Sequence, residues 1–448
     1  MITLRFCLLA LLLNEAARCT VIAAPPPALP RRAHLGLVIH SSDSNSTPQL
    51  PRVRRAEPNS LAAELDIRPG DSILAVNGRR LTSTADFAKT LRTLRGGERV
   101  RLMVERSGKS RELEGLLLEE PRENIPGVEV LYDSIKDTHD EQLRTIITRP
   151  PSGKEKFPVI FVAGWLSDDS IEAPDNTKSG TGLIFRALAK LPGFATMRMD
   201  KPGVGDSEGD CAETDFETEL AGYRAAFASL TKYDFIDPHR VYIVGVSNGG
   251  GFAPLIASTE SDAKRIRGYV VAGGWVKTWF EHMMEIERRR LTFEGRSPEE
   301  VNNAMKGAAA FYTDYLINEQ TPGEILKRHP DFASLWSDDG THQYGRPARF
   351  YHQLQRLNLA AAWSKVAVPT LAVHGEYDWI MSRADHEMIA SYVNANKAGL
   401  ARFVELAKTG HTLDHYPDMQ SAFKFEAASF DPAVLQLLTG WFREQLRK

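Results

Sequence analysis

The sequence predicts an α/β protein: a doubly wound, mostly parallel sheet with a small, β-rich domain before it. From about residue 128 onward, continuous apolar runs such as residues 159–162 alternate with stretches of helical periodicity. A continuous apolar run is typical of a strand that is buried on both faces. Strands separated by helices are connected by right-handed crossovers, so most of them are expected to lie parallel. Residues 35–120 instead show short strands between turns, which indicates a separate domain.

The length and composition are those of a globular protein with more than one domain. The chain has 448 residues, of which 42% are hydrophobic and 25% are charged. A chain of this length is too long for one ordinary hydrophobic core, so two domains with appendages are expected. The net charge of -3 provides no field that would attract nucleic acid or an anionic membrane, so neither partner is indicated.

The amino end has the pattern of a signal peptide. Arg5 precedes a short apolar run at residues 6–13, and small residues at 21–24 offer a cleavage site. The apolar run is too short to cross a bilayer as a helix, so no transmembrane segment is expected. We therefore expect residues 1–24 to be a signal peptide and the protein to be exported, either to a periplasm or as a secreted protein. The alternatives are an unprocessed helix and a lipoprotein anchored through Cys19.

After the signal peptide, the chain is expected to begin with a linker and to lack intramolecular disulfides. Residues 25–34 are rich in proline and predict an extended, semi-rigid segment. Cys7 and Cys19 would be lost with the signal peptide, which leaves Cys211 as the remaining cysteine. A single cysteine has no partner within its own chain.

Residues 35–120 resemble a bacterial PDZ domain. Within residues 60–78, a helical segment, a Pro-Gly-Asp turn, an Ile-Leu strand and an Asn-Gly turn follow one another in the order typical of that family. Asp66 stands where the family usually has glycine, and aspartate tolerates the left-handed conformation. The resemblance implies that the loop of Leu35, Gly36 and Leu37 captures polypeptide C-termini through its N–H groups. The alternative is a packing module that binds no peptide.

The nucleophile candidate is Ser247, which stands in the sequence Gly-Val-Ser-Asn-Gly at residues 245–249. The apolar run at 241–244 predicts a strand before it, and residues 252–257 are compatible with a helix after it. This is the context of a G-x-S-x-G nucleophile elbow. On such a strained turn the hydroxyl stands clear of the backbone, and the two glycines avoid collisions with neighbouring elements. The amino end of the helix would favour a developing oxyanion.

Two residues further along the chain are candidates for the partners of this serine. A serine hydroxyl becomes a strong nucleophile when an imidazole takes its proton, and the imidazole needs a carboxylate that fixes its tautomer. Asp378 follows a predicted strand in a Gly-x-x-Asp sequence, with Asp385 and Glu376 as alternatives. His411 follows the next predicted strand in a Gly-His pair. We expect both side chains to reach Ser247 at the carboxyl edge of the sheet.

Residues 128–448 resemble the α/β-hydrolase superfamily, nearest to its serine aminopeptidase-like and esterase branch. The elbow, the Gly-x-x-Asp and Gly-His sequences and the Asp-x-x-Gly-x-Gly-x-Ser-x-Gly loop at 200–209 carry the resemblance. The resemblance implies that the helical stretch at about 276–362 is a cap over the active site. The loop at 200–209 is expected to be structural, because it lacks the Gly-Lys-Ser/Thr end of a phosphate-binding P-loop.

The resemblance also implies an oxyanion site made by the backbone N–H groups of Asn248 and Trp165. Trp165 follows the first strand of the parallel set, and Leu166 is the alternative donor. Two N–H groups aimed at one oxygen stabilise a tetrahedral intermediate. The chain departs from many members of the superfamily at Ala163, where histidine commonly precedes Gly164.

Together these features predict an exported serine hydrolase that cleaves a carboxylic ester, or an amide or peptide bond, through an acyl-enzyme. No organic cofactor is implied. His415 lies four residues after His411, but no third ligand has convincing spacing, so no metal is expected either. The alternatives are a serine aminopeptidase-type peptidase and a non-catalytic peptide-binding protein that uses the hydrolase fold as a scaffold.

Overall fold

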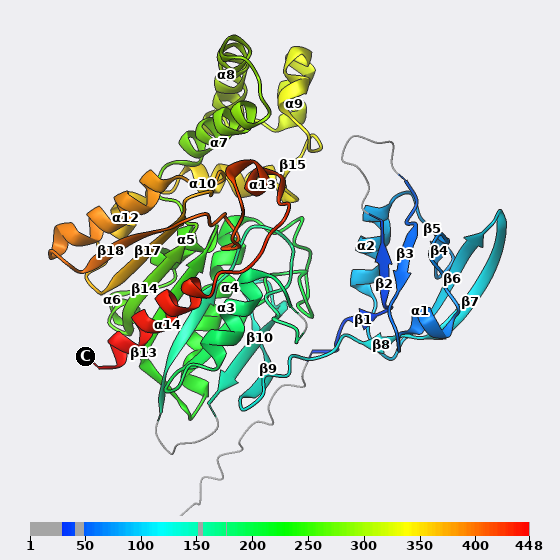
Figure 1. The fold of residues 1–448 in the computed structure, drawn as a ribbon, viewed down its shortest axis with the longest axis horizontal. Coiled ribbons are helices and arrows are strands. Elements are labelled where there is room, and N and C mark those ends of the chain that lie inside the picture. Colours follow the sequence, from blue (N-terminus) through cyan, green and yellow to red (C-terminus); the bar gives the residue numbers. More distant parts are fainter. Residues whose placement is uncertain (1–28, 41–48, 151–155, 176, 448) are drawn as a thin grey trace, which may run out of the picture.

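The computed structural model describes residues 29–40, 49–150, 156–175 and 177–447. The expected signal peptide at 1–24 lies outside the described residues. Figure 1 shows a large domain built on a twisted sheet with helices on both faces, and a small domain rich in strands beside it. Among the described residues, no helix has the length and hydropathy that would let it cross a membrane.

The large domain contains an eight-stranded sheet with the order β18-β17-β14-β13-β11-β12-β10-β9. β9 and β10 form an antiparallel pair at one edge, and β10 also lies antiparallel to β12. The remaining neighbours pair in parallel, which confirms the predicted α/β fold. The strands are β9 (Glu129–Lys136), β10 (Gln142–Arg149), β11 (Phe157–Ala163), β12 (Ala195–Met199), β13 (Ile236–Val246), β14 (Ile266–Ala272), β17 (Thr370–Gly375) and β18 (Ala401–Leu406).

Helices cover both faces of this sheet because its strands are apolar on both sides. Along β13, Val241 and Ile243 belong to one hydrophobic core, and Tyr242 and Val244 belong to the other. A strand buried in this way has a continuous apolar sequence, which is the pattern that predicted it. The helices on the first face include α4 (Phe216–Ser229) and α12 (Arg383–Asn396), and those on the second face include α3 (Gly180–Ala189) and α14 (Pro432–Leu446).

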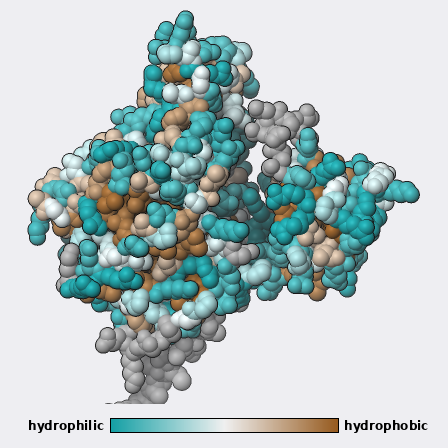
Figure 2. Space-filling view, in the orientation of Figure 1, coloured by the Kyte–Doolittle hydropathy of each residue, from teal (hydrophilic) through white to brown (hydrophobic). Residues whose placement is uncertain are grey.

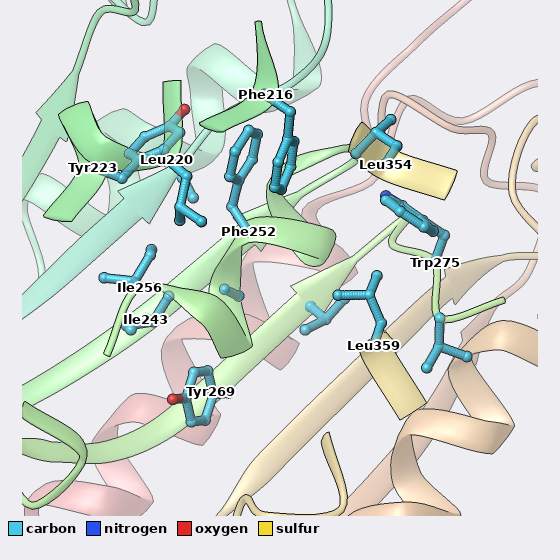
Figure 3. Close-up of a cluster of buried hydrophobic side chains, with 14 of the residues drawn as sticks. Phe216, Leu220, Tyr223, Ile243, Phe252, Ile256, Tyr269, Trp275, Leu354 and Leu359 are labelled. Atoms are coloured by element: carbon cyan, nitrogen blue, oxygen red, sulfur yellow. The ribbon is translucent and has the colours of Figure 1, made fainter. Parts of the chain in front are cut away.

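The short helix α5 (Gly249–Phe252) is anchored to α4 by aromatic packing (Figure 3). The ring of Phe252 stacks on Phe216 with centroids 4.4 Å apart and lies 5.1 Å from the ring of Tyr223. All three side chains are buried. Close-packed aromatic rings of this kind resist displacement, so the turn between β13 and α5 has a fixed position on the helix layer.

A group of helices lies between β14 and β17 in the sequence, and α7, α8 and α9 of this group lie beyond the sheet edge where α5 begins (Figure 1). Three of them start with a capping box, in which a Ser or Thr side chain and a Glu side chain satisfy free N–H groups. Figure 2 shows a mostly hydrophilic outer surface on α8 and α9. The large aromatic side chains of Phe311 and Tyr312 in α8 and of Tyr315 just after it are buried in the core. The group comprises α7 (Trp279–Phe293), α8 (Pro298–Tyr312), α9 (Pro322–Arg328), α10 (Ala348–Gln355) and α11 (Leu359–Trp363).

The small domain has a four-stranded sheet, a two-stranded sheet and two helices around a core of its own. Asp66 has a φ of 53°, the left-handed conformation expected where the PDZ family usually has glycine. Its carboxylate lies 2.8 Å from the guanidinium of Arg68. The elements are β2 (Leu37–Ile39), β3 (Val53–Ala56), α1 (Leu61–Glu64), β4 (Ser72–Val76), β5 (Arg79–Arg80), α2 (Thr84–Thr93), β6 (Arg99–Arg106) and β7 (Lys109–Leu116).

Residues 31–34 of the expected linker are held by both domains. β1 (Ala33–His34) pairs with β8 (Leu118–Glu119). The guanidinium of Arg31 bonds to Asp206 at 2.5 Å and to Glu172 at 2.9 Å, both in the large domain. The linker expectation rested on proline content, which describes the stiffness of the backbone and carries no information about ion pairs with residues far away in the sequence.

Candidate active site

Ser247 lies on a sharp turn between β13 and α5, with a left-handed φ of 56°. Such a conformation is strained for a residue with a side chain, and it lifts the hydroxyl out of the strand direction. The turn also needs glycine on both sides. A Cβ at Gly245 would lie 2.5 Å from the carbonyl oxygen of Gly249, and one at Gly249 would lie 2.1 Å from that of Ala163.

Three side chains from different strand ends form one chain of hydrogen bonds. The Oγ of Ser247 lies 2.8 Å from Nε2 of His411, and Nδ1 of His411 lies 2.9 Å from Oδ2 of Asp378. Asp378 follows β17 and His411 follows β18, which is the neighbouring parallel strand. Parallel strands end at the same edge of a sheet, so residues far apart in the sequence meet there. The structure therefore brings Ser247, His411 and Asp378 together.

The surroundings of Asp378 keep its carboxylate ionised. Its Oδ1 accepts hydrogen bonds of 2.9 Å from the N–H groups of Ile380 and Met381. Burial alone would raise the pKa of Asp378, but the electrostatic interaction and hydrogen bond with the ring of His411 and the hydrogen bond from the N–H of Met381 outweigh it, so the pKa lies below its usual value. An ionised carboxylate only accepts, so Nδ1 of His411 donates to it and Nε2 is left to accept from Ser247.

Asp385 and Glu376, the alternative acids, bond to other groups. Oδ1 of Asp385 accepts from the N–H groups of Val276 and Lys277 at 2.9 and 3.1 Å. Glu376 accepts from the N–H of Lys408 at 2.8 Å. Asp385 thus ties the chain between β14 and α7 to the start of α12, and Glu376 braces the turn that follows β18.

The loop after β11 lies directly beside the elbow. Besides Ala163, the carbonyl of Gly164 would lie 2.6 Å from a Cβ at Gly249. The N–H of Gly164 donates to the hydroxyl of Tyr223 at 3.0 Å. In the described part of the chain, the N–H groups of Trp165 and Asn248 donate to no other protein group. The N–H of Leu166, the alternative donor in the same loop, likewise has no protein acceptor among the described residues.

The predicted peptide-binding loop precedes β2 in the small domain, whereas α5 lies in the large domain (Figure 1). Gly36 has a φ of 73°, and a Cβ there would lie 2.1 Å from that of Ser60, so this position requires glycine. Leu35 is buried and Leu37 begins β2. Within the described residues β2 pairs with β3 alone, which leaves its second edge open for an added strand.

Two residues near the site were missed from the sequence. His282 on α7 is 3% exposed, its Nδ1 has no partner in the described part of the molecule, and burial lowers its pKa to about 4. Lys201 lies in the loop at 200–209 and bonds to the loop of Trp165. A histidine in a helical segment and a lysine in a glycine-rich loop are common on surfaces, and no sequence pattern marked either as buried.

A metal site is not formed by the histidines near Ser247. His411 uses both ring nitrogens for Ser247 and Asp378, and His415 faces Ser429, with Nδ1 and the Oγ of Ser429 3.5 Å apart. Within the described ranges, no group of three or more His, Cys, Asp or Glu residues is placed to hold a metal ion.

The parallel sheet with its elbow after β13 defines the large domain as an α/β hydrolase. A family model described as serine aminopeptidase, S33, matches residues 182–413, and a PDZ domain model matches residues 52–106. The first match spans more than half of the chain. The protein therefore belongs to the serine aminopeptidase S33 family of hydrolases and carries a PDZ domain before its hydrolase domain.

Solved esterases are similar to this chain in part of its length. Est1E from Butyrivibrio proteoclasticus with bound ferulic acid is 18% identical, with a TM-score of 0.45 over 71% of this chain and 100% of that one. The esterase domain of a Rhodothermus marinus protein is 16% identical, with a TM-score of 0.42 over 70% of this chain and 98% of that one. The curated quorum-quenching protein AidA of Acinetobacter baumannii is 37% identical over 70 residues, which are 15% of this chain and 23% of that protein.

Proposed function

We propose that this hydrolase cleaves carboxylic esters through an acyl-enzyme on Ser247, with His411 as general base and Asp378 as the group that orients it. The continuous hydrogen-bond chain from Ser247 through His411 to Asp378 carries the proposal. Each link has the length of a good hydrogen bond, and each donor faces a group that can accept.

The proposed reaction transfers one acyl group twice. Ser247 attacks the ester carbonyl while Nε2 of His411 takes its proton, and the N–H groups of Trp165 and Asn248 bind the oxyanion. The intermediate collapses when His411 returns the proton to the leaving alcohol oxygen, which releases the alcohol and leaves an acyl-serine. Water then attacks the acyl-serine with His411 again as base, and the carboxylic acid and free Ser247 are formed.

A second candidate is an aminopeptidase, which the name of the family favours. An aminopeptidase needs an acidic group that holds the α-ammonium of its substrate. Two buried carboxylates were candidates for the acid of this site, Asp378 and Asp385. Both already accept hydrogen bonds from backbone N–H groups. An ester makes no such demand and has a better leaving group, so the site supports ester cleavage more directly.

The PDZ domain supports a second, separate role, the capture of polypeptide C-termini at Leu35, Gly36 and Leu37. The open edge of β2 and the glycine-dependent loop before it support this role. Isothermal titration against a library of C-terminal peptides is expected to yield binders, and a library without one would contradict it. Export also remains our proposal, and sequencing the amino end of the protein recovered from outside the cytoplasm tests cleavage near residue 24.

Labelling with a fluorophosphonate tests the proposed nucleophile. We expect covalent labelling of the wild-type protein and none of Ser247→Ala, together with hydrolysis of some members of a panel of p-nitrophenyl esters and aminoacyl anilides. The variant should lose at least about 10⁴-fold in kcat. A folded wild-type protein that takes no label would instead favour a non-catalytic binding protein, and anilide turnover without ester turnover would favour the peptidase.

A further inference from the structure

Lys201 places a buried ammonium group behind the loop that carries Trp165. The residue follows β12 by two positions and is 4% exposed. Its Nζ donates to the carbonyl oxygen of Trp165 and, at 2.9 Å, to that of Ser167. One side chain therefore holds two carbonyl groups of this loop, one on the residue before Leu166 and one on the residue after it.

Polar bonds hold this loop at three places. The hydroxyl of Tyr223 accepts from the N–H of Gly164 at its start, and Oδ1 of Asp200 accepts from the N–H of Ile171 at its end, at 2.9 Å. Lys201 holds the middle. Side-chain packing supports the middle of the loop less than its ends. A cavity of about 10 Å³, roughly enough for one water molecule, is lined there by Trp165, Tyr223 and Lys201.

The charge on Lys201 is only partly balanced by its neighbours. Glu219 of α4 lies 3.8 Å away and is shared with the buried guanidinium of Arg346. Burial, with the charge of Arg346, lowers the pKa of Lys201 to about 7. A buried cation with this much desolvation is costly unless its hydrogen bonds compensate, and its two direct bonds go to the loop.

We propose that Lys201 is a positioning residue for the oxyanion site, because it fixes the carbonyls of Trp165 and Ser167 and so keeps the N–H of Trp165 aimed beside Ser247. This inference rests on the proposed serine hydrolase function. An oxyanion donor works only within a narrow range of distance and direction, and a shift of about 1 Å in such a group costs about 10²-fold in rate.

The variant Lys201→Met keeps the length of the side chain and removes its donors. We expect kcat on a p-nitrophenyl ester to fall about 10- to 100-fold while KM changes less than about threefold, because the loss acts on the transition state. Lys201→Gln provides an amide N–H donor in place of the amine, and its kcat should lie between those of Lys201→Met and the wild type. It also provides the measurement if Lys201→Met does not fold.

The preference for an ester over the matching thionoester separates positioning from a general structural role. Sulfur is larger than oxygen and a weaker acceptor, so an aligned pair of N–H groups favours the C=O substrate. We expect the ester-to-thionoester ratio of kcat/KM to fall about tenfold in Lys201→Met, in line with the partial loss of one donor. A ratio equal to that of the wild type would overturn the proposal, whatever happens to kcat.

Arg265→Met is the matched control. Arg265 is a largely buried cation that also holds two backbone carbonyls, those of Pro238 at 2.8 Å and Phe227 at 3.1 Å, away from the elbow. It should lower stability without changing the ester-to-thionoester ratio, and a ratio that falls equally in both variants would contradict the inference. A wild-type protein without ester turnover or fluorophosphonate labelling would contradict the proposed function itself, and this inference would fall with it.

Discussion

At the scale of single residues, the buried ionisable groups around Ser247 differ in the charge state that their surroundings favour. Asp378 remains an acceptor because His411 and two backbone N–H groups outweigh the cost of burial. His282 and His386 lack comparable compensation, and burial lowers the pKa of each to about 4. The same low-dielectric surroundings therefore keep one group charged and two neutral at neutral pH.

Asp378→Asn should lower kcat by about 10⁴-fold, because an amide that donates to Nδ1 of His411 fixes the wrong tautomer. The measurement is steady-state hydrolysis of a p-nitrophenyl ester. Asp385→Asn is the control, since Asp385 does not contact His411 and its loss should cost less than about tenfold. Equal activity losses in the two variants would argue against Asp378 as the orienting acid.

His282→Phe should reduce the loss of stability on acidification. In the unfolded chain a histidine binds its proton below about pH 6.5, whereas buried His282 does so only near pH 4. Between these values the unfolded state binds more protons, so stability falls as the pH is lowered through this window. Urea unfolding at pH 7 and 4.5 should show a pH-dependent loss about 2 kcal/mol smaller in the variant.

His139→Gln is the control for this experiment, because the side chain of His139 is 58% exposed. It should lose as much stability as the wild type over the same pH range. If His282→Phe and the wild type lose equal amounts, burial of His282 does not contribute to the acid sensitivity of the fold.

At the scale of elements, the position of Ser247 depends on how closely α5 approaches β11. The backbone at Gly249 lies so near the carbonyl of Ala163 that no Cβ fits between them. The ring of Phe252, stacked on Phe216, holds the other end of this short helix. The elbow therefore packs tightly against the end of β11 and the start of the loop that carries Trp165.

Gly249→Ala should abolish fluorophosphonate labelling, because the new Cβ would lie 2.1 Å from a backbone oxygen and would push α5 away from β11. Gly440→Ala is the matched control: Gly440 lies in α14, and a Cβ there meets nothing within 4 Å. Its replacement should leave labelling intact and raise the unfolding free energy by about 0.5–1 kcal/mol, since alanine favours helix. Full labelling of Gly249→Ala would contradict the close approach.

At the scale of the whole molecule, a buried ion network joins the segment before the PDZ domain to the hydrolase domain. Arg31 and Asp206 are each 2% exposed, and Asp206 also pairs with Arg144 at 2.9 Å. Asp206 belongs to the same loop as Lys201, so the residues that hold the two domains together adjoin those that hold the Trp165 loop. The contact of Arg92 with Asp168, which also joins the two domains, is solvent-exposed.

Arg31→Met should destabilise the protein by about 2–3 kcal/mol, because buried Asp206 and partly buried Glu172 each lose a counter-charge. Thermal unfolding and limited proteolysis between the domains measure the effect. Arg92→Met removes an ion pair whose partners are 47% and 44% exposed, and it should cost less than about 1 kcal/mol. Similar losses of stability in Arg31→Met and Arg92→Met would mean that the buried ion network is not the main interaction that joins the two domains.

The sequence alone determined the fold class, the PDZ domain and the hydrolase family, because these depend on local patterns. Apolar runs of strand length, glycines at fixed offsets and turn sequences are set by backbone geometry within a few residues. The prediction of a mostly parallel sheet was confirmed, and Ser247, Asp378 and His411 were nominated from the short motifs that follow its strands.

Only the tertiary structure decided which distant groups meet. The hydrogen bond between Asp378 and His411 depends on where two strand ends lie, and the burial of Lys201 behind Trp165 and of Arg31 against Asp206 depends on packing between elements far apart in the chain. The identity of a charged residue does not show whether its side chain lies on the surface or in the core. Its burial and its partners arise only when the whole chain has folded, and for that reason they could not be predicted from the sequence.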